Sequence, residues 1–311
     1  MGGKLRVAVI GVGYLGRFHA LIYSRMSDVE LVGVADVDAA AARRVAEEAG
    51  TRPFTDHRDL VDEVDAVSIV VPTSRHLAVA RPFLEQGVHM LLEKPIAATA
   101  DEAETIVRLA EAHGVILQIG HLERFNAGVM ALAGYIETPR FIEAHRMSPF
   151  VARATDVDVV SDLMIHDIDI ILSLVGAGIR AISAVGTPVL TSHIDIANAR
   201  LEFENGAVAN VIASRVSEKQ IRRIRVFERN RYLSLDFIDQ RIETAFPHPV
   251  KDSAWPEIVT ERIDVEPVRP LDTELAAFVE SVQTGRPPLV DGRVGQKALD
   301  VALQVKAKIG A

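Results

Sequence analysis

The chain has 311 residues, of which 34 are Lys or Arg and 43 are Asp or Glu, so its net charge is −9. This balance opposes a nucleic-acid partner, because binding to a phosphate backbone depends on basic surface. The absence of cysteine excludes disulfides, thiolate catalysis and cysteine-ligated metal. The start of the chain shows no signal-peptide pattern, and no apolar run approaches the ~20 residues that span a bilayer, so we expect a cytoplasmic protein with no membrane partner.

The first predicted strand, residues 4–10, runs directly into the glycine loop GVGYLG at 11–16, and a helical pattern follows. This unit suits a pyrophosphate: Gly11 permits the tight turn, Gly13 lets the phosphate approach the backbone, and Gly16 allows close helix packing. The helix N-terminus adds amides and the positive end of its dipole. The glycine pattern alone is weak, since similar loops join strands to helices in many folds. We expect the cofactor to contact Gly11, Gly13, Tyr14, Leu15 and Gly16.

A second predicted strand, residues 30–36, ends in Asp36, twenty residues after Gly16. A carboxylate at this position accepts hydrogen bonds from both ribose hydroxyls of the adenosine and repels a 2′-phosphate, so the sequence predicts NAD as the cofactor in preference to NADP. The alternative is that Asp36 only caps the next helix, since Asp is a good N-cap. Asp38 is better placed for that cap.

Strands and helices continue to alternate after this unit. Strands are predicted at residues 65–71, 88–94 and 115–120, and helices at about 74–86 and 101–112. This rhythm is typical of a doubly wound parallel sheet, an α/β fold.

Ligands of such sheets bind at the carboxyl ends of the strands, so the loops at residues 72–76, 93–95 and 120–126 should line one crevice. Polar residues on crevice loops are more often functional than those in core elements, although each also has a purely structural alternative. On the cofactor side we expect Pro72, Thr73, His76, Glu93 and Lys94, and on the substrate side His121, Arg124 and Asn126.

Residues 161–174 predict a helix with an unusual polar stripe. At about 100° per residue, Asp162, His166, Asp169 and Ser173 fall within about 60° of one another, and nearly all other positions are apolar. A solvent-facing stripe is the common interpretation, but such stripes usually carry Lys, Glu and Arg. A metal site at His166 and the two aspartates lacks further ligands at suitable spacing, so no metal is expected. A polar stripe inside a cleft is the third alternative.

From about Arg140 the pattern changes to antiparallel strands, with a hairpin at residues 194–216 around Asn205-Gly206. Apolar residues are predicted on both faces of this hairpin. If helices cover one face, the other needs a partner, which predicts a homodimer or homotetramer through the C-terminal sheet. One face is expected to carry Ile194, Ile196 and Val211, and the other Ala197, Leu201, Phe203 and Ile212.

The glycine loop, the Glu-Lys-Pro at residues 93–95 and the Asp-x-x-x-His pair at 162–166 together resemble the glucose-fructose oxidoreductase, inositol dehydrogenase and MocA (Gfo/Idh/MocA) family over the whole chain. The resemblance implies an NAD-binding Rossmann domain at 1–121. It also implies a substrate-binding and oligomerisation α/β domain at 122–311, with an open, mainly antiparallel sheet and a last helix that returns toward the first domain. In relatives the Lys94-Pro95 bond is often cis, whereas X-Pro bonds in general are cis in only about 5% of cases.

The resemblance also implies a sugar dehydrogenase with Lys94, Asp162 and His166 as its catalytic residues. Oxidising a secondary alcohol benefits from a base and a cation near the oxygen. We assign His166 as proton acceptor, Lys94 as the donor that holds the oxygen, and Asp162 as orienter of His166 or of a substrate hydroxyl. The family leaves open whether Lys or His takes the proton. For Lys94, the alternative is an ordinary surface lysine. For the protein, one alternative is a reductase that uses the same residues to reduce a carbonyl group. The other is a non-catalytic NAD-binding regulator, which should have lost one of the three catalytic residues.

Residues 120–129 and 156–170 most resemble the subgroup that oxidises the 3-hydroxyl of UDP-N-acetylglucosamine ahead of an aminotransferase, for amide-linked lipid A or related amino sugars. Dehydrogenases of other sugars or of inositol share parts of both segments. The resemblance implies a nucleotide-sugar substrate held by His121, Arg124, Asn126 and Arg153 together with Asp162 and His166. A diphosphate requires cations. Further candidate cations are Arg146, Arg222, Arg223 and Arg225, of which the last three better suit a solvated strand face.

Overall fold

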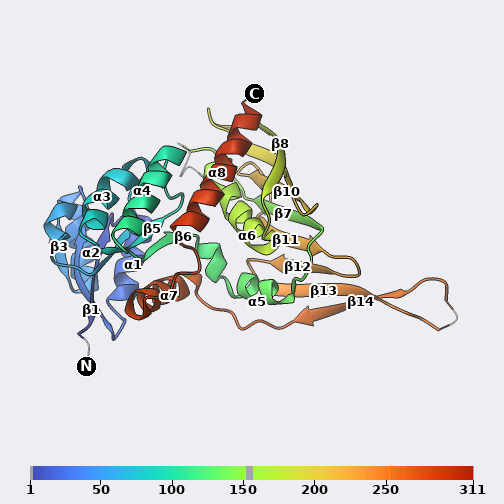
Figure 1. Cartoon of the computed structure of the whole chain (residues 1–311), viewed down its shortest axis with the longest axis horizontal. Coiled ribbons are helices and arrows are strands. Elements are labelled where there is room, and N and C mark those ends of the chain that lie inside the picture. The colour runs from blue at the N-terminus through green and yellow to red at the C-terminus, as the bar shows by residue number, and fades with distance from the viewer. Residues whose placement is uncertain (1–2, 152–156, 252, 311) are drawn as a thin grey trace. The chain divides into compact units, whose positions relative to one another are not determined.

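The computed structural model describes residues 3–151, 157–251 and 253–310. The chain forms two compact units, the first from residues 1–122 and 271–299, the second from 123–270 and 300–311 (Figure 1). The predicted boundary after residue 121 lies next to the observed start of the second unit. The segment 271–299, however, packs with the first unit, whereas the resemblance implied a return toward this unit only for the last helix.

The first unit is built on a six-stranded parallel sheet with strand order β3-β2-β1-β4-β5-β6. β1 pairs with β2 on one side and β4 on the other, so the direction of winding reverses at β1. The run of Val, Ala and Ile in β1 and β4 is typical of strands buried on both faces. The strands are β1 (Leu5–Ile10), β2 (Val29–Ala35), β3 (Arg52–Phe54), β4 (Ala66–Ile69), β5 (His89–Glu93) and β6 (Leu117–Gly120).

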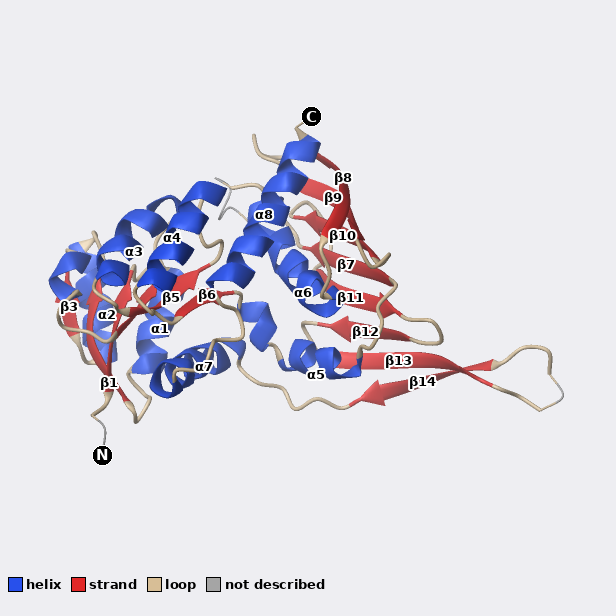
Figure 2. Ribbon diagram, in the orientation of Figure 1, coloured by secondary structure: helices blue, strands red, loops and turns tan. Residues whose placement is uncertain are grey.

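Helices cover both faces of this sheet (Figure 2). On one face, Tyr23 of α1 and Phe278 of α7 pack into an apolar cluster with Val7 and Val9 of β1. On the other face α3 contacts α4, and the start of α8 packs on β6 at Gly295. The helices are α1 (Tyr14–Tyr23), α2 (Ala39–Ala49), α3 (His76–Glu85), α4 (Ala100–Ala112), α7 (Pro270–Thr284) and α8 (Gly292–Ile309), with 3₁₀ turns at His57–Leu60 and Thr73–Arg75.

The second unit contains an eight-stranded open sheet with strand order β14-β13-β12-β11-β7-β10-β9-β8. Its neighbours are antiparallel except for the parallel pair β7 and β10. The α/β fold class, with a parallel Rossmann sheet and a mainly antiparallel second sheet, is thereby confirmed. The strands are β7 (Phe141–Met147), β8 (Ile179–Thr187), β9 (Ile196–Phe203), β10 (Val208–Ser214), β11 (Ile221–Phe227), β12 (Tyr232–Asp236), β13 (Arg241–His248) and β14 (Glu257–Ile263).

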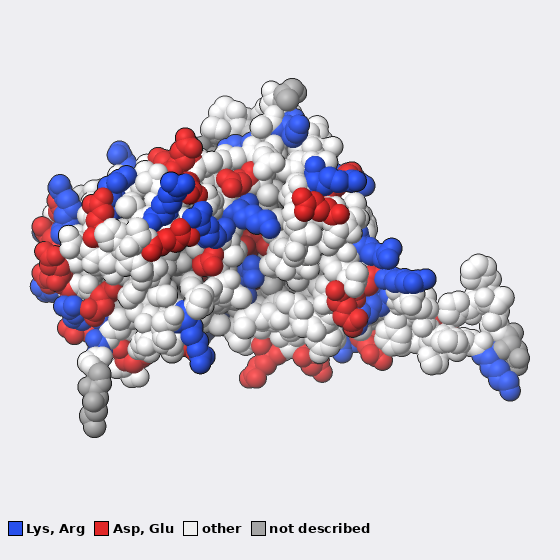
Figure 3. Space-filling model, in the orientation of Figure 1, with Lys and Arg blue, Asp and Glu red and all other residues white. Residues whose placement is uncertain are grey.

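Helices α5 (Ala127–Tyr135) and α6 (Ile165–Val175) pack against one face of this sheet, α5 on β12 and β13, and α6 on β7 and β10. The covered face is apolar, with Ala144, Leu201 and Ile224 fully buried. The β13–β14 hairpin extends beyond the rest of the sheet (Figure 1). Acidic and basic side chains are interspersed on the face of the molecule seen in Figure 3. Within the described ranges, none of the helices has the length and apolar character needed to cross a membrane.

The β9–β10 hairpin has a different register from the one predicted. The main-chain nitrogen of Gly206 donates to Phe203 at 3.0 Å, and that of Phe203 donates to Ala207 at 2.9 Å, with Gly206 at φ +85°. This is a three-residue loop with a bulge at glycine. A one-residue shift of register moves every side chain to the opposite face. Val211 therefore lies opposite Ala199 on the covered face, and Ile212 lies on the other face, the reverse of our prediction.

The uncovered face of the sheet is mixed rather than apolar. Ile212 lies there opposite Asn198, and the next pair on this face is Arg200 with Asn210. The prediction of two apolar faces is therefore wrong for this hairpin, because the bulge places Val211 under the helices and leaves polar side chains on the open side.

Candidate active site

The glycine loop between β1 and α1 has the backbone geometry of a phosphate-binding turn. Gly11 lies at φ +87°, and a Cβ there would be 2.6 Å from the main-chain oxygen of Val70. A Cβ on Gly16 would lie 1.9 Å from the carbonyl oxygen of Gly11, so α1 packs directly on its own loop. In contrast, no described heavy atom lies within 4 Å of a Cβ built on Gly13, the N-cap of α1. Since no described side chain caps this helix, its first turn fits a pyrophosphate.

Asp36 holds the glycine loop against the end of β2. Its Oδ2 accepts a hydrogen bond from the main chain of Val12 at 2.8 Å, and its Oδ1 accepts one from the main chain of Asp38 at 2.9 Å. Asp38 caps α2 through the nitrogens of Ala40 and Ala41, as predicted. A carboxylate offers about four acceptor positions, so Asp36 retains capacity for ribose hydroxyls.

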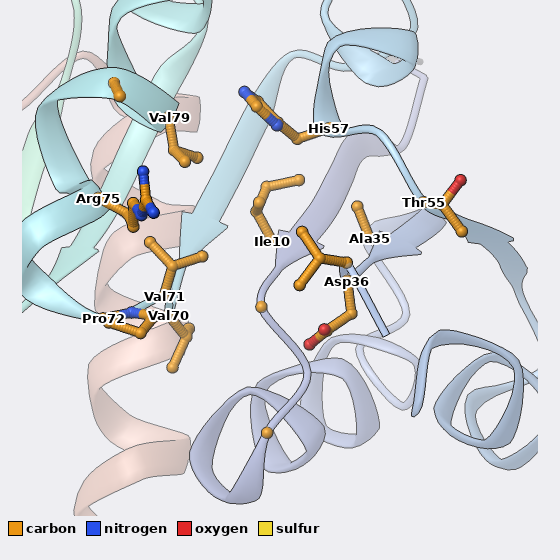
Figure 4. A pocket seen from close by; sticks show the side chains of 14 residues that line it. Ile10, Ala35, Asp36, Thr55, His57, Val70, Val71, Pro72, Arg75 and Val79 are labelled. Carbon is orange, nitrogen blue, oxygen red and sulfur yellow. The ribbon is translucent and has the colours of Figure 1, made fainter. Parts of the chain in front are cut away.

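A cavity of about 760 Å³ lies beside Asp36 in the first unit (Figure 4). Among the residues predicted to bind the cofactor, Gly11, Gly13, Asp36 and Pro72 line it. Tyr14, Leu15, Gly16, Thr73, His76, Glu93 and Lys94 lie outside its lining. The cavity opens where β1, β2 and β4 end, as expected for a ligand of a doubly wound sheet.

Several lining residues were missed by the sequence analysis. Val37 is part of the lining. Val79, His57 and Arg75 also line the cavity and are seen around it in Figure 4. Burial lowers the pKa of His57, which favours a neutral ring. Apolar walls with a few polar groups fit an adenosine. The only signal for Val37 was its place directly after Asp36, whereas the turn that carries His57 showed none.

The cofactor preference should change when the charge of Asp36 is replaced. Asp36→Ser with Val37→Arg should shift the ratio of kcat/KM for NAD over NADP by about 10- to 100-fold toward NADP, because an arginine can form charge-assisted hydrogen bonds with the 2′-phosphate. The substitution also removes the hydrogen bond between Asp36 and the main chain of Val12. Any loss of activity from this change affects both cofactors, so it cancels in the ratio. Asp38→Asn is the matched control, since it removes a neighbouring charge but keeps a capping side chain. Equal use of both cofactors by the unaltered enzyme would contradict the assignment of Asp36.

The buried ring of His76 contacts the main chain beside two of the loops predicted to line the crevice. Its Nε2 lies 3.0 Å from the main-chain oxygen of Val71 and its Nδ1 lies 3.2 Å from that of Ile96, and only 1% of the residue is exposed. Burial lowers the pKa of His76. The ring therefore links the loops that follow β4 and β5.

The Glu-Lys-Pro segment follows the end of β5. Glu93 is buried, and its Oε2 accepts a hydrogen bond from the main-chain nitrogen of Lys94 at 3.2 Å. Lys94 is half-buried, and the Lys94-Pro95 bond is cis. His121, directly after β6, is buried in the same unit.

The helix with the polar stripe begins with a π turn at Val160–Met164 and continues as α6. The prediction of a uniform α-helix is therefore wrong for this first turn, which is wider than an α turn. Asp158 holds its start, accepting from the main chain of Ser161 at 2.9 Å and pairing with Lys306 at 2.8 Å. π turns occur frequently at functional sites.

The residues of the stripe differ in their exposure. Asp162 in the π turn and His166 in α6 are half-buried, Asp169 is buried, and Ser173 is exposed. A solvent-facing stripe does not account for Asp169, whose Oδ1 lies 3.5 Å from the Nη1 of Arg124.

Asp167 was missed by the sequence analysis, and it anchors α6 to the sheet. It pairs with Arg146 of β7 through two hydrogen bonds of 2.9 and 3.0 Å, and both residues are almost completely buried. Arg146 also donates to Glu123 at 2.7 Å and stacks on Phe237. Arg146 was a candidate for binding a diphosphate, but two carboxylates already neutralise its charge. The only signal for Asp167 was an acid on the apolar side of a helix.

The other substrate-side candidates occupy different positions in the second unit. Asn126 caps α5, with its Oδ1 accepting from Gly128 at 2.9 Å, and its Nδ2 donates to Phe237 at 3.3 Å. On β11, Arg222 lies 3.8 Å from Glu123. Arg223 donates to Ser234 and Arg225 pairs with Glu143, on the uncovered face. Arg153 lies outside the described residues.

The structure brings Gly11, Gly13, Asp36 and Pro72 together around one cavity. Asp162 and His166 lie on one helical segment of the second unit. Lys94 belongs to the first unit, so its joint action with His166 is a proposal. Among the described residues, no group of three or more His, Asp or Glu side chains could hold a metal ion.

Comparison with known proteins agrees with this geometry. Residues 5–121 match the GFO_IDH_MocA model, described as an oxidoreductase family with an NAD-binding Rossmann fold, and residues 129–231 match the GFO/IDH/MocA C-terminal domain. The chain is 40% identical to UDP-N-acetylglucosamine 3-dehydrogenase of Acidithiobacillus ferrooxidans, over 99% of this chain and 98% of that protein. A solved structure of that dehydrogenase gives a TM-score of 0.93, covering 98% of this chain and 97% of its own. Identity to scyllo-inositol 2-dehydrogenase of Bacillus subtilis is 30%, over 70% of this chain and 69% of that one.

The phosphate-binding turn, the carboxylate of Asp36 beside an apolar cavity and the two matched domain models agree with one another. The chain belongs to the Gfo/Idh/MocA family of oxidoreductases and uses NAD as its cofactor.

Proposed function

We propose that the chain oxidises the 3-hydroxyl of UDP-N-acetylglucosamine to the 3-keto sugar. The observation that carries this proposal is the 40% identity to a UDP-N-acetylglucosamine 3-dehydrogenase over 99% of the chain. The alternative is an inositol or another sugar, supported by relatives at about 30% identity over some two thirds of the chain.

The catalytic residues of the proposal are Lys94, Asp162 and His166. When bound, NAD would supply the hydride acceptor for the carbon that bears the hydroxyl. His166 accepts the hydroxyl proton, and Lys94 donates a hydrogen bond to the same oxygen and stabilises its growing negative charge. Asp162 orients His166 or a neighbouring substrate hydroxyl. The π turn supports this arrangement, because it sets Asp162 at the wider start of the helix that carries His166.

Arg124 and Arg153 are our proposed cations for the diphosphate. The side chain of Arg124 is 12% exposed and pairs with Asp169 only at 3.5 Å, so it is less fully neutralised than Arg146. His121 and Asn126 complete the proposed substrate side, Asn126 mainly by holding the start of α5.

The nucleotide part of the substrate should dominate recognition. Each charge-assisted hydrogen bond to a diphosphate contributes about 1.5 to 3 kcal/mol, so UDP-N-acetylglucosamine should exceed free N-acetylglucosamine by roughly 10²-fold or more in kcat/KM. UDP should compete with the substrate, and added salt should raise KM more than it lowers kcat. NAD reduction across UDP-sugars, free sugars and inositols measures this preference.

Arginine variants provide the controls for this prediction. Arg153→Ala should raise KM with little change in kcat, as expected when uniform binding is lost. Arg108→Ala, which removes an exposed cation from α4, is the matched control and should leave both constants unchanged. If inositol or glucose reacts as well as the nucleotide sugar and UDP does not inhibit, the substrate proposal is wrong but the dehydrogenase assignment stands.

We also propose a place for the reaction and an assembly for the enzyme. A 3-keto sugar is the type of compound that an aminotransferase converts to an amine, which suits the cytoplasmic synthesis of amide-linked lipid A or related amino sugars. A homodimer or homotetramer through the uncovered face is supported by half-buried apolar residues on that face. They include Phe141, Met147, Ile212, Phe227 and Tyr232. Light scattering would measure the oligomeric state.

A further inference from the structure

A cluster of buried polar side chains lies behind Glu93 in the first unit, and the proposed chemistry does not use it. Glu274 comes from α7, His19 from α1 and Gln118 from β6, and each is 0% exposed. Glu93 itself is 9% exposed and directly precedes Lys94. An acidic, a basic and an amide side chain from α7, α1 and β6 are thus buried in a unit whose core is otherwise packed with apolar residues.

Short contacts connect these residues. The Nε2 of Gln118 donates to the main-chain oxygen of Glu274 at 3.1 Å, and the Nε2 of His19 lies 3.5 Å from the Oε1 of Glu93. A Cβ on Gly120 would lie 2.8 Å from the carboxyl carbon of Glu93, so only glycine leaves space for this carboxyl. The other oxygen of Glu93 accepts from the main chain of Lys94 at 3.2 Å.

The cluster contains several unpaired polar atoms. Among the described residues, no hydrogen-bond partner reaches either carboxyl oxygen of Glu274, the amide oxygen of Gln118 or the ring nitrogens of His19. The hydroxyl of Tyr23 is already paired with Ser68 at 2.9 Å. An unpaired buried carboxylate costs several kcal/mol. One proton on Glu274 removes that charge and supplies a donor among these acceptors.

The ionisable groups of the cluster around Glu274 are Glu93 of β5 and His19 and Tyr23 of α1, and of these it is Glu93 that favours the protonated form of Glu274. Burial, and then the charge of Glu93, raises the pKa of Glu274 well above its usual value of 4.5. Burial also raises the pKa of Tyr23, and the nearby Glu274 adds to that shift.

We propose that Glu274 is a positioning residue that stays protonated at neutral pH, donates a hydrogen bond to an acceptor of this cluster, and thereby fixes Glu93 beside Lys94. The main chain of Lys94 is bonded to Glu93, so a shift of this carboxyl would move the turn that carries Lys94. This consequence rests on the proposed role of Lys94 in catalysis. The protonation of Glu274 does not depend on that role.

The pH dependence of stability tests the protonation. A carboxyl whose pKa is raised in the folded state stabilises the fold below its unfolded pKa, and this stabilisation is lost as the pH rises through the folded pKa. Glu274→Gln keeps a neutral donor of the same shape and has no such dependence. The free energy of unfolding of Glu274→Gln relative to the unaltered enzyme should therefore rise between about pH 5 and about pH 8.

Infrared spectroscopy gives an independent measurement. The band of a protonated carboxylic acid at neutral pH should be missing from the spectrum of Glu274→Gln. Phe278→Leu, in the same helix, is the matched control: it should lower stability equally at all pH values and retain the band. Parallel pH curves for the unaltered enzyme and Glu274→Gln, with no band lost, would overturn the proposal.

Kinetics test the positioning role. Glu274→Leu removes the donor and should lower kcat roughly 10-fold or more, because a small misplacement of a catalytic group is costly. Its KM for NAD should change little, and Glu274→Gln should restore most of kcat. Normal kcat in a folded Glu274→Leu variant would overturn the positioning role. Failure of the catalytic proposal would instead appear as normal turnover of Lys94→Ala, with the stability difference of Glu274→Gln intact.

Discussion

Replacing Lys94 or His166 by alanine is expected to lower kcat by ~10² or more, the usual contribution of a general acid or base. The reason is that alcohol oxidation requires removal of the hydroxyl proton while negative charge grows on the oxygen. NAD binding measured by calorimetry should stay near that of the unaltered enzyme, because the cavity beside Asp36 is lined by other residues.

The pH profile of kcat/KM should identify the proton acceptor. A base works only when unprotonated, so the profile of the unaltered enzyme should fall at acidic pH, and the variant that loses the base should lose this limb. His113→Ala and Lys308→Ala are matched controls, since both residues are exposed, and they should keep normal turnover. If Lys94→Ala or His166→Ala is fully active, the residue replaced has no catalytic role.

Asp167→Ala is expected to lower the free energy of unfolding by about 3 kcal/mol, near the lower end of the range for breaking a buried ion pair. The substitution leaves the guanidinium of Arg146 buried, with Glu123 as its one remaining charged partner among the described residues. Urea unfolding measures the loss. Because α6 carries His166, turnover should fall as well.

Two further variants separate the ion pair from simple loss of packing. Arg225→Ala breaks a half-exposed pair with Glu143 and should cost less than 1 kcal/mol. The double variant Asp167→Leu with Arg146→Met should recover much of the stability, because it leaves no unpaired charge. A loss below 1 kcal/mol for Asp167→Ala would mean that the pair does not anchor the helix.

Local pattern was sufficient for the glycine loop and the helix cap in the cofactor half of the molecule. Gly11 and Gly16 are required by close approaches to Val70 and to the loop itself, and such approaches occur within a single strand-turn-helix unit. Asp38 caps the helix that begins one residue later. These features depend on residues near each other in the chain, so their spacing predicts them.

Polar residues that act across the fold were harder to assign. Asp167 and Arg146 are 21 positions apart and meet only when α6 packs on β7. Asn126 was predicted as a substrate ligand, and the structure adds that its amide nitrogen donates to the main-chain oxygen of Phe237, 111 positions away. Sequence spacing does not reveal whether a loop residue faces a ligand or a buried main-chain oxygen, because both environments select the same side chain.

The sequence by itself determined the parallel sheet, the phosphate-binding turn, the cap of α2 and the use of NAD, since periodicity, glycine and a carboxylate act locally. Tertiary structure decided which strand faces are covered, because one bulged residue at Gly206 exchanges the two sides of β10 relative to the predicted register. It also decided that α7 packs with the first unit, where the carboxyl of Glu274 lies behind Glu93, 181 positions earlier in the chain. Burial and charge at such positions depend on which distant segments meet.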